Sequence, residues 1–142
     1  MENGWIAQLN RVLKEYQDEV QKLQKGKRMF DGVMGLGNHP GNAPCHEIMD
    51  RQVEALCGQA TDAVETEGIS ELILRIFQAQ GEWQGPEYAR LMLAAIQRHT
   101  LPLISRLPAE EKEMLRRWYE QAYPRRKRLP VQDQILAALK QA

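Results

Sequence analysis

Apolar residues recur at intervals of three and four positions along most of the chain, and this spacing predicts helices. The clearest case precedes Gly26, where the apolar stripe consists of Ile6, Leu9, Leu13, Tyr16, Val20 and Leu23. Asn3 is the expected N-cap of this first helix, and Gly26 is its expected end. Trp5 and Val12 widen the stripe beyond a strict coiled-coil seam, which is typical of a helix in a bundle.

The periodic pattern stops between Gly26 and Pro44. This stretch is rich in glycine and also contains Pro40, so it predicts a long Gly/Pro-rich loop between the first and second helices. Its apolar residues predict that the loop packs against the remainder of the protein; they are Met29, Phe30, Val33, Met34 and Leu36. The second helix is expected to begin near Asn42 or Ala43, with Pro44 in its first turn.

Five further apolar faces follow. The second helix presents Met49, Val53, Leu56 and Ala60, and its end near Gly58 is not defined by the pattern. A third helix opens at Gly68 or Ser70 with Leu72, Ile73, Ile76 and Phe77, and residues 81–86 (GEWQGP) break it. The fourth helix begins at Pro86, and its expected face contains Tyr88, Leu91, Met92, Ala95, Ile96 and His99. The fifth, from Pro108 to Pro124, presents Met114, Leu115, Trp118, Tyr119 and Ala122. The sixth, from Pro130, presents Val131, Ile135, Leu136 and Leu139.

Only a short helical turn fits between Pro102 and Ile104, and alternating β-branched runs, which would predict strands, are absent from the sequence. The predicted class is therefore all-α: a single-domain bundle of about five or six helices spanning residues 1–142.

Composition narrows the functional classes. The 142 residues carry 19 basic and 19 acidic side chains, so no global field attracts the chain to nucleic acid or to a membrane. The charged amphipathic start is unlike a signal peptide, and no apolar run reaches membrane-spanning length. Two cysteines do not make a disulfide framework, and a cytoplasmic location is expected.

A glycine pattern, Gly32-x-x-Gly35-x-Gly37, invites comparison with phosphate-binding loops. The dinucleotide fingerprint needs a different spacing and a preceding strand, whereas a helix is predicted here. Pro44 also removes one of the backbone donors that an anion would use at the following helix. The pattern favours a connector over a phosphate site.

One candidate metal or thiol site surrounds this loop; its residues are His39, Cys45, His46, Glu47 and Asp50. Nitrogen and sulfur ligands would suit zinc, although no second cysteine pair with metal spacing exists and no cofactor is expected. In an up-and-down bundle, His99 would lie about 20 Å from His46. On a helical wheel Cys45 lies within the apolar stripe and His46 at its edge, which favours a buried, slow thiol beside a half-exposed histidine.

A basic segment near the carboxyl terminus is a candidate nucleic-acid patch; its cations are Arg116, Arg117, Arg125, Arg126, Lys127 and Arg128. The neighbouring rings, Trp118, Tyr119 and Tyr123, could stack on bases. Trp118 and Tyr119 already belong to an apolar helix face, however, and nearby glutamates reduce the field. Nucleic-acid binding is therefore the weaker interpretation.

Catalytic signatures are absent from the sequence. The chain is best interpreted as a protein-interaction or structural module without catalytic activity, and a homodimer with the first helix in its interface is expected. The alternatives are the ligand, metal or thiol site around Cys45-His46 and nucleic-acid binding through the basic turn.

Overall fold

The computed structural model describes residues 4–33, 43–64 and 66–141, with residues 26–33 as backbone only. These ranges contain helices and no strand, so the predicted all-α class is confirmed. Six helices have nine residues or more: α1 (Gly4–Val33), α2 (Pro44–Asp62), α3 (Ile69–Glu82), α4 (Glu87–Ala95), α6 (Ala109–Ala122) and α7 (Pro130–Lys140). Shorter elements are η2 (Ile96–Thr100), α5 (Leu101–Ile104) and η3 (Arg125–Lys127).

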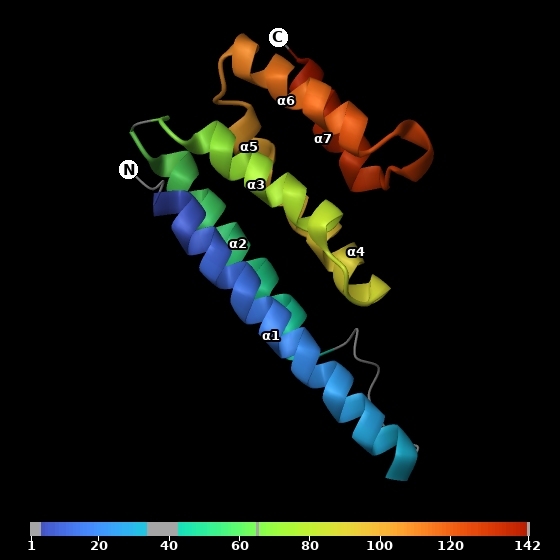
Figure 1. Ribbon diagram of the computed structural model, residues 1–142. Helices are drawn as coiled ribbons and strands as arrows, with labels where there is room; N and C mark the ends of the chain where they lie inside the picture. Colours follow the sequence, from blue (N-terminus) through green and yellow to red (C-terminus); the bar gives the residue numbers. More distant parts are fainter. Residues whose placement is uncertain (1–3, 34–42, 65, 142) are drawn as a thin grey trace.

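The helices form three layers (Figure 1). Helix α1 and the antiparallel α2 make one layer, α3 to α5 make the middle one, and α6 with α7 make the third. The end of α1 extends beyond the beginning of α2, past the body of the bundle (Figure 1).

The first helix is longer than the sequence predicts. It continues through Gly26 to Val33, so the prediction that Gly26 ends it is wrong. A glycine inside a helix lowers the stability of the helix by about 1 kcal/mol relative to alanine. The neighbouring residues Lys25, Lys27, Arg28 and Met29 are strong helix formers, and their propensities offset this loss. Gly32 therefore lies in α1. Asn3, Gly35, Gly37 and the predicted packing of Met34 and Leu36 lie outside the described residues, as do the side chains of Met29, Phe30 and Val33.

The start of α2 agrees with the prediction, because Pro44 occupies its first turn after the extended residue Ala43. Its end, which the pattern left undefined, is set by a distant side chain. The Arg106 guanidinium donates to the carbonyls of Ala60, Thr61 and Ala63 at 2.9, 2.5 and 2.8 Å. These bonds satisfy carbonyls that have no partner inside the helix.

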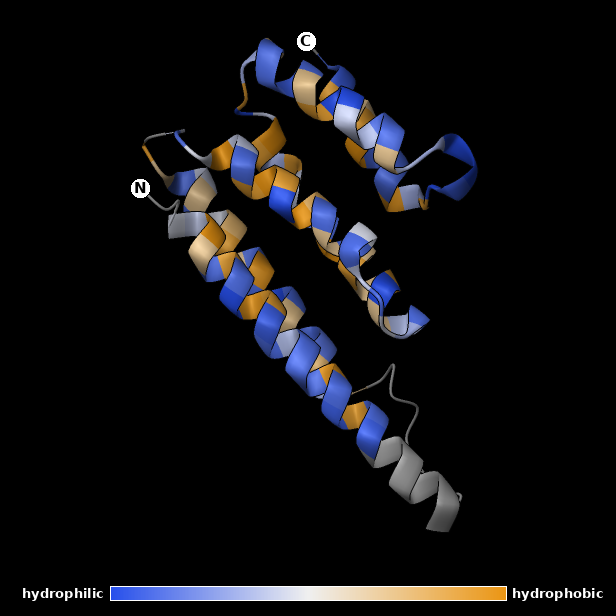
Figure 2. Ribbon diagram, viewed as in Figure 1, coloured by the Kyte–Doolittle hydropathy of each residue, from blue (hydrophilic) through white to orange (hydrophobic). Residues whose placement is uncertain are grey.

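Most of the predicted apolar faces are buried. Hydrophobic and hydrophilic residues alternate along the helices (Figure 2). All four residues named for each of α2 and α3 are buried, as are Ile135, Leu136 and Leu139 of α7. Three residues of the predicted faces are instead exposed: Leu91 is 47% exposed, Met114 is 66% exposed, and Ala122 is exposed. Helix α4 packs between α2, α3 and α7 through Ala89 and Leu93, one residue away from the expected stripe, because neighbours on several sides select a different face.

A buried polar network joins the middle and third layers. The Tyr119 hydroxyl donates to Gln97 at 2.6 Å, and the Gln132 amide donates to Gln80 at 2.6 Å. Gln97 also lies 3.4 Å from Gln80, and all the side chains of Tyr119, Gln97 and Gln132 are inaccessible to solvent. Satisfied networks of this kind favour one arrangement of the helices, because other arrangements would leave buried polar groups without hydrogen-bond partners.

Candidate binding groove

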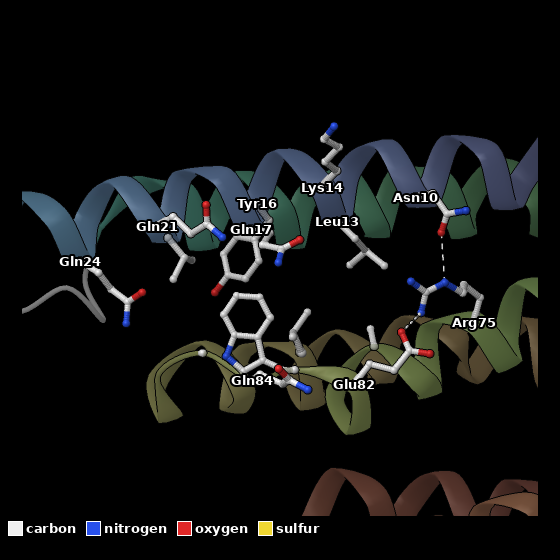
Figure 3. Close-up of a pocket in the computed structure, with 15 residues that line it drawn as sticks. Asn10, Leu13, Lys14, Tyr16, Gln17, Gln21, Gln24, Arg75, Glu82 and Gln84 are labelled. Atoms are coloured by element: carbon white, nitrogen blue, oxygen red, sulfur yellow. Dashed lines mark hydrogen bonds and ion pairs between the residues drawn. The ribbon is translucent and has the colours of Figure 1, made fainter.

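A groove of about 780 Å³ lies between α1 and α3 and is the candidate binding site (Figure 3). One side is a stripe of polar side chains on α1, spaced by four and three residues: Asn10, Lys14, Gln17, Gln21 and Gln24. Four of the five carry side-chain amides, the exception being Lys14, and we call the five residues the amide stripe. All of them are exposed to solvent.

The position of the amide stripe follows from the apolar stripe beside it. Leu9, Leu13, Tyr16, Val20 and Leu23 each precede a member of the amide stripe by one residue. Successive residues of an α-helix are rotated by about 100°, so burying the apolar stripe turns the amide stripe to the edge of the core. Leu9, Tyr16 and Val20 are indeed buried.

The other wall comes from α3, from its connection to α4 and from α4 itself. Arg75, Ala79 and Glu82 lie on α3, and residues 83–85 form the connection. Leu93 of α4 and Val20 of α1 contribute buried apolar surface at the base of the groove. The site therefore combines an apolar base with rims made mostly of side-chain amides, together with Lys14 on α1 and with Arg75 and Glu82 on α3.

The end of the groove near the start of α1 is closed by polar contacts (Figure 3). Arg75 Nε donates to Asn10 Oδ1 at 3.1 Å, and its terminal nitrogen pairs with Glu82 at 3.1 Å. Because Arg75 and Glu82 neutralise one another, Lys14 is the one charged lining residue that has no ion pair in the described part of the chain.

Two aromatic rings, from Tyr16 and Trp83, meet across the groove with centroids 6.1 Å apart. Trp83 Nε1 donates to the carbonyl of Pro86 at 3.0 Å, which folds the connection back on itself. A Cβ at Gly85 would lie 2.5 Å from the Trp83 ring, so glycine is required for this close approach. The sequence GEWQGP thus does more than break a helix, because it holds an aromatic ring in the wall.

Tyr16 is fixed from behind by His46. The Tyr16 hydroxyl and His46 Nδ1 share a hydrogen bond of 2.7 Å, and the His46 ring lies edge-on to Tyr88 at 5.5 Å. Burial, with Cys45 and Tyr88 nearby, raises the pKa of Tyr16 far above its usual range, so the phenol remains neutral.

The prediction of a half-exposed His46 beside a buried Cys45 is therefore wrong. His46 is only 3% exposed, whereas Cys45 is half-buried. The inward stripe of α2 is His46, Met49, Val53, Leu56 and Ala60, and the hydrogen bond to Tyr16 makes a histidine acceptable at its first position.

Cys45 lines a second, smaller cavity of about 450 Å³ between α1 and α2. Burial, reinforced by the negative charge of Glu19, raises the pKa of the Cys45 thiol. The surroundings thus disfavour the thiolate that a nucleophile or metal ligand requires.

The described members of the candidate metal site have separate partners. His46 binds Tyr16, Glu47 pairs with Arg51 at 2.6 Å, and Asp50 contacts Arg98 at 2.8 Å and His99 at 3.0 Å. No group of three suitable ligands occurs within the described ranges. His39 lies outside them, so the zinc hypothesis stays a prediction.

The expected separation of about 20 Å between His46 and His99 is too large. His99 contacts Asp50, which is one helical turn after His46. Helix α2 extends over 19 residues, so His99 lies beside the first half of α2 and not beside its far end.

The basic segment is divided by its ion pairs. Arg116 and Arg117 pair with Glu113, and Arg128 lies 3.2 Å from Asp133. Arg125, Arg126 and Lys127 are exposed in η3, without an ion pair among the described residues. Tyr119 and Tyr123 are buried and Trp118 is partly buried against Phe77, so the rings are occupied by packing. Three of the six cations are thus paired with carboxylates, and nucleic-acid binding through this segment stays a prediction.

No protein-family model, curated protein or solved structure matches this chain. Within the described ranges, no helix combines the length and apolar character needed to cross a membrane.

Sequence reasoning did not identify the groove, although part of its signal is present in the sequence. The amide stripe has the same 3.5-residue spacing as the apolar stripe next to it, and three of its five members are glutamine. The opposite wall could not have been found this way, because the pairing of α1 with α3 is a long-range contact.

Proposed function

We propose that this protein is a protein-interaction module that binds an α-helix in the groove between α1 and α3. The observation that carries the proposal is the amide stripe beside the Tyr16–Trp83 pair, on the rim of an open groove.

The geometry of the stripe favours a helical ligand. From Asn10 to Gln24 it covers about 21 Å, or roughly four helical turns. Its 3.5-residue spacing is the spacing with which two helices keep contact along their length. A helix placed here would set its apolar side chains against Tyr16, Trp83 and Leu93, and its polar flanks against the amides.

Binding is favoured over catalysis by the chemistry of the lining residues. Amides can donate and accept hydrogen bonds but do not act as acids, bases or nucleophiles at neutral pH. The two ionisable residues of the α3 wall, Arg75 and Glu82, are paired with each other. The thiol nearest to the groove, Cys45, faces the separate cavity on the other side of α1.

A cytoplasmic site of action belongs to the proposal. Both cysteines, Cys45 and Cys57, are free thiols, which accords with a reducing compartment. Fractionation of the cells that produce the protein tests this part.

The groove is tested by selecting binders from a displayed library of randomised amphipathic helices against the immobilised protein. Selected helices are then measured against Gln17→Glu/Gln21→Glu, which changes two exposed members of the amide stripe with little change in shape. We expect roughly tenfold weaker binding, as for central interface positions. Trp83→Ala should weaken the same helices, after circular dichroism has established that the variant is folded.

The matched control is Gln8→Glu/Gln59→Glu, because both residues are exposed on α1 and α2 and neither lines the groove. Control binding should equal that of the wild type. Selected helices that bind all three variants and the wild type equally would contradict the proposed site.

A further inference from the structure

We infer that the cavity between α1 and α2 binds a small amphiphilic cation, an amine carried on an apolar body. The two helices lie side by side (Figure 1), and the cavity between them has a volume of about 450 Å³. Small-molecule sites often lie between the helices of a bundle, with volumes of about 300 to 1,000 Å³. Binding in this cavity does not depend on what occupies the groove.

The walls of the cavity are mostly apolar. Tyr16 and Met49 are buried, whereas Leu23 and Cys45 are half-buried. Ile48 is 55% exposed, so a large apolar side chain is left open to water in the wall of an apolar cavity. Removing such surface from water is favourable. An apolar ligand would therefore be stabilised by covering surface that the fold leaves exposed.

The charged side chains of the lining have one sign. Glu15 and Glu19 lie one turn apart on α1, and none of the described lining residues is basic. Glu15 is exposed and makes no ion pair in the described part of the chain. Glu19 pairs with Lys22 at 3.1 Å, but both side chains remain more than half exposed, which makes this a weak pair. A ligand cation can therefore approach both carboxylates without breaking a buried contact.

The negative charge of Glu19 is felt inside the cavity as well as at its edge. Burial is the larger cause of the raised pKa of the Cys45 thiol, and the charge of Glu19 raises it further. A field that disfavours a thiolate also disfavours a bound anion and favours a bound cation. The cavity should therefore prefer an amine over a carboxylate on the same apolar body.

The extent of the cavity favours a small molecule over a segment of another protein. Ten of the described residues line it, and they come from α1 and from residues 43–52 at the beginning of α2. A standard protein interface has about 20–30 residues on each side. The cavity is thus smaller than a protein partner needs and large enough for an alkylamine.

The first test compares three eight-carbon probes by isothermal titration calorimetry: n-octylamine, n-octanol and sodium n-octanoate. At neutral pH the amine is a cation and the octanoate is an anion. We expect saturable binding of octylamine and about fivefold weaker binding of octanol, with octanoate weakest of the three. Added sodium chloride should reduce the preference for the amine, because both carboxylates are exposed. Octanoate that binds as tightly as octylamine, or no saturable binding of octylamine, would overturn the inference.

The second test separates the charge from the apolar wall. Glu15→Gln/Glu19→Gln should abolish the preference for octylamine over octanol, whereas Ile48→Ser should weaken both probes. The control Asp18→Asn/Glu67→Gln removes two exposed acidic groups that do not line the cavity, and it should bind octylamine like the wild type. Circular dichroism establishes that each variant is folded. An amine preference that survives Glu15→Gln/Glu19→Gln would contradict the inference.

The third test locates the ligand through Cys45, which lines the cavity. Labelling of the wild type with a thiol reagent is followed for each cysteine by peptide mass spectrometry. At about ten times its dissociation constant, octylamine should slow the labelling of Cys45 roughly tenfold. Labelling of Cys45 that octylamine leaves unchanged would overturn the inference. Protection by a lysine-rich amphipathic peptide but not by octylamine would also overturn it, and would assign the cavity to a protein partner.

Discussion

Tyr16 connects the groove to the core: its ring faces Trp83 at 6.1 Å, and its hydroxyl binds Nδ1 of the buried His46 at 2.7 Å. The same side chain therefore forms binding surface on one side and satisfies a buried polar group on the other. This double role separates two effects that mutations in the site can produce.

Tyr16→Phe should keep the aromatic surface and lose the hydrogen bond. We expect the free energy of unfolding to fall by about 1 kcal/mol, while affinity for the selected helices changes little. His46→Ala should cost more, about 2–4 kcal/mol, because it also opens a cavity between Tyr16 and Tyr88. Urea unfolding checks both values. Loss of less than half a kcal/mol for His46→Ala would show that the buried hydrogen bond is unimportant.

Arg106→Lys should destabilise the protein although it preserves the charge. A lysine ammonium cannot reproduce the fork that reaches the carbonyls of Ala60, Thr61 and Ala63. We expect a loss of about 1–3 kcal/mol in thermal or urea unfolding. The matched control is Arg90→Lys, since Arg90 makes only an exposed ion pair with Glu87. Equal stability of the two variants would contradict the assigned cap.

Acid should weaken the contact between α2 and the η2 region through Asp50. Burial opposes ionisation of this carboxyl, but the stronger combined effect of hydrogen bonds and charges from His99 and Arg98 lowers its pKa below the ordinary 3.8. A lowered folded-state pKa stabilises the protein above the unfolded value, and this stabilisation is lost as pH falls through the folded one.

Urea unfolding of Asp50→Asn should therefore show a smaller loss of stability than the wild type as pH falls below about 4. Asp18→Asn serves as the control, because Asp18 is exposed and makes no ion pair in the described ranges. Identical pH profiles for the wild type and Asp50→Asn would disprove the assigned coupling.

Both thiols should react slowly in the folded protein. Burial raises the pKa of Cys57 to about 12, and it also raises that of the half-buried Cys45. With a colourimetric disulfide reagent at neutral pH, we expect Cys45 to react before Cys57 and both to react much faster in urea. The Cys45→Ser variant shows which kinetic phase of the reaction belongs to Cys45. A rapid native phase that this substitution removes would identify Cys45 as a reactive thiol.

Helix positions and most buried faces could be predicted from periodicity, because the apolar stripes of α2 and α3 record which side packs inward. The end of α1 could not, since glycine at position 26 signals a stop only when its neighbours do not support a helix. The prediction that His46 is half-exposed was wrong for a similar reason. A helical wheel gives the angle of His46 on its helix, but it does not show the hydrogen bond from Tyr16, thirty positions earlier, that makes burial of the histidine acceptable.

The groove and the Arg106 cap lie beyond local patterns altogether. Arg75 and Asn10 are separated by 65 positions, and Arg106 and Ala60 by 46. Nothing in the sequence near either residue indicates its partner. Periodicity specifies the faces of helices, whereas their mutual arrangement emerges from packing of all faces at once.

The most direct test of the helix-binding groove is a nuclear magnetic resonance titration of isotope-labelled protein with a helix selected as described above. The account predicts that the indole N–H signal of Trp83 and the side-chain amide signals of Gln17 and Gln21 shift together and saturate. The amide signals of the control residues Gln8 and Gln59 should remain in place. Saturable binding that leaves Trp83, Gln17 and Gln21 unshifted would contradict the account.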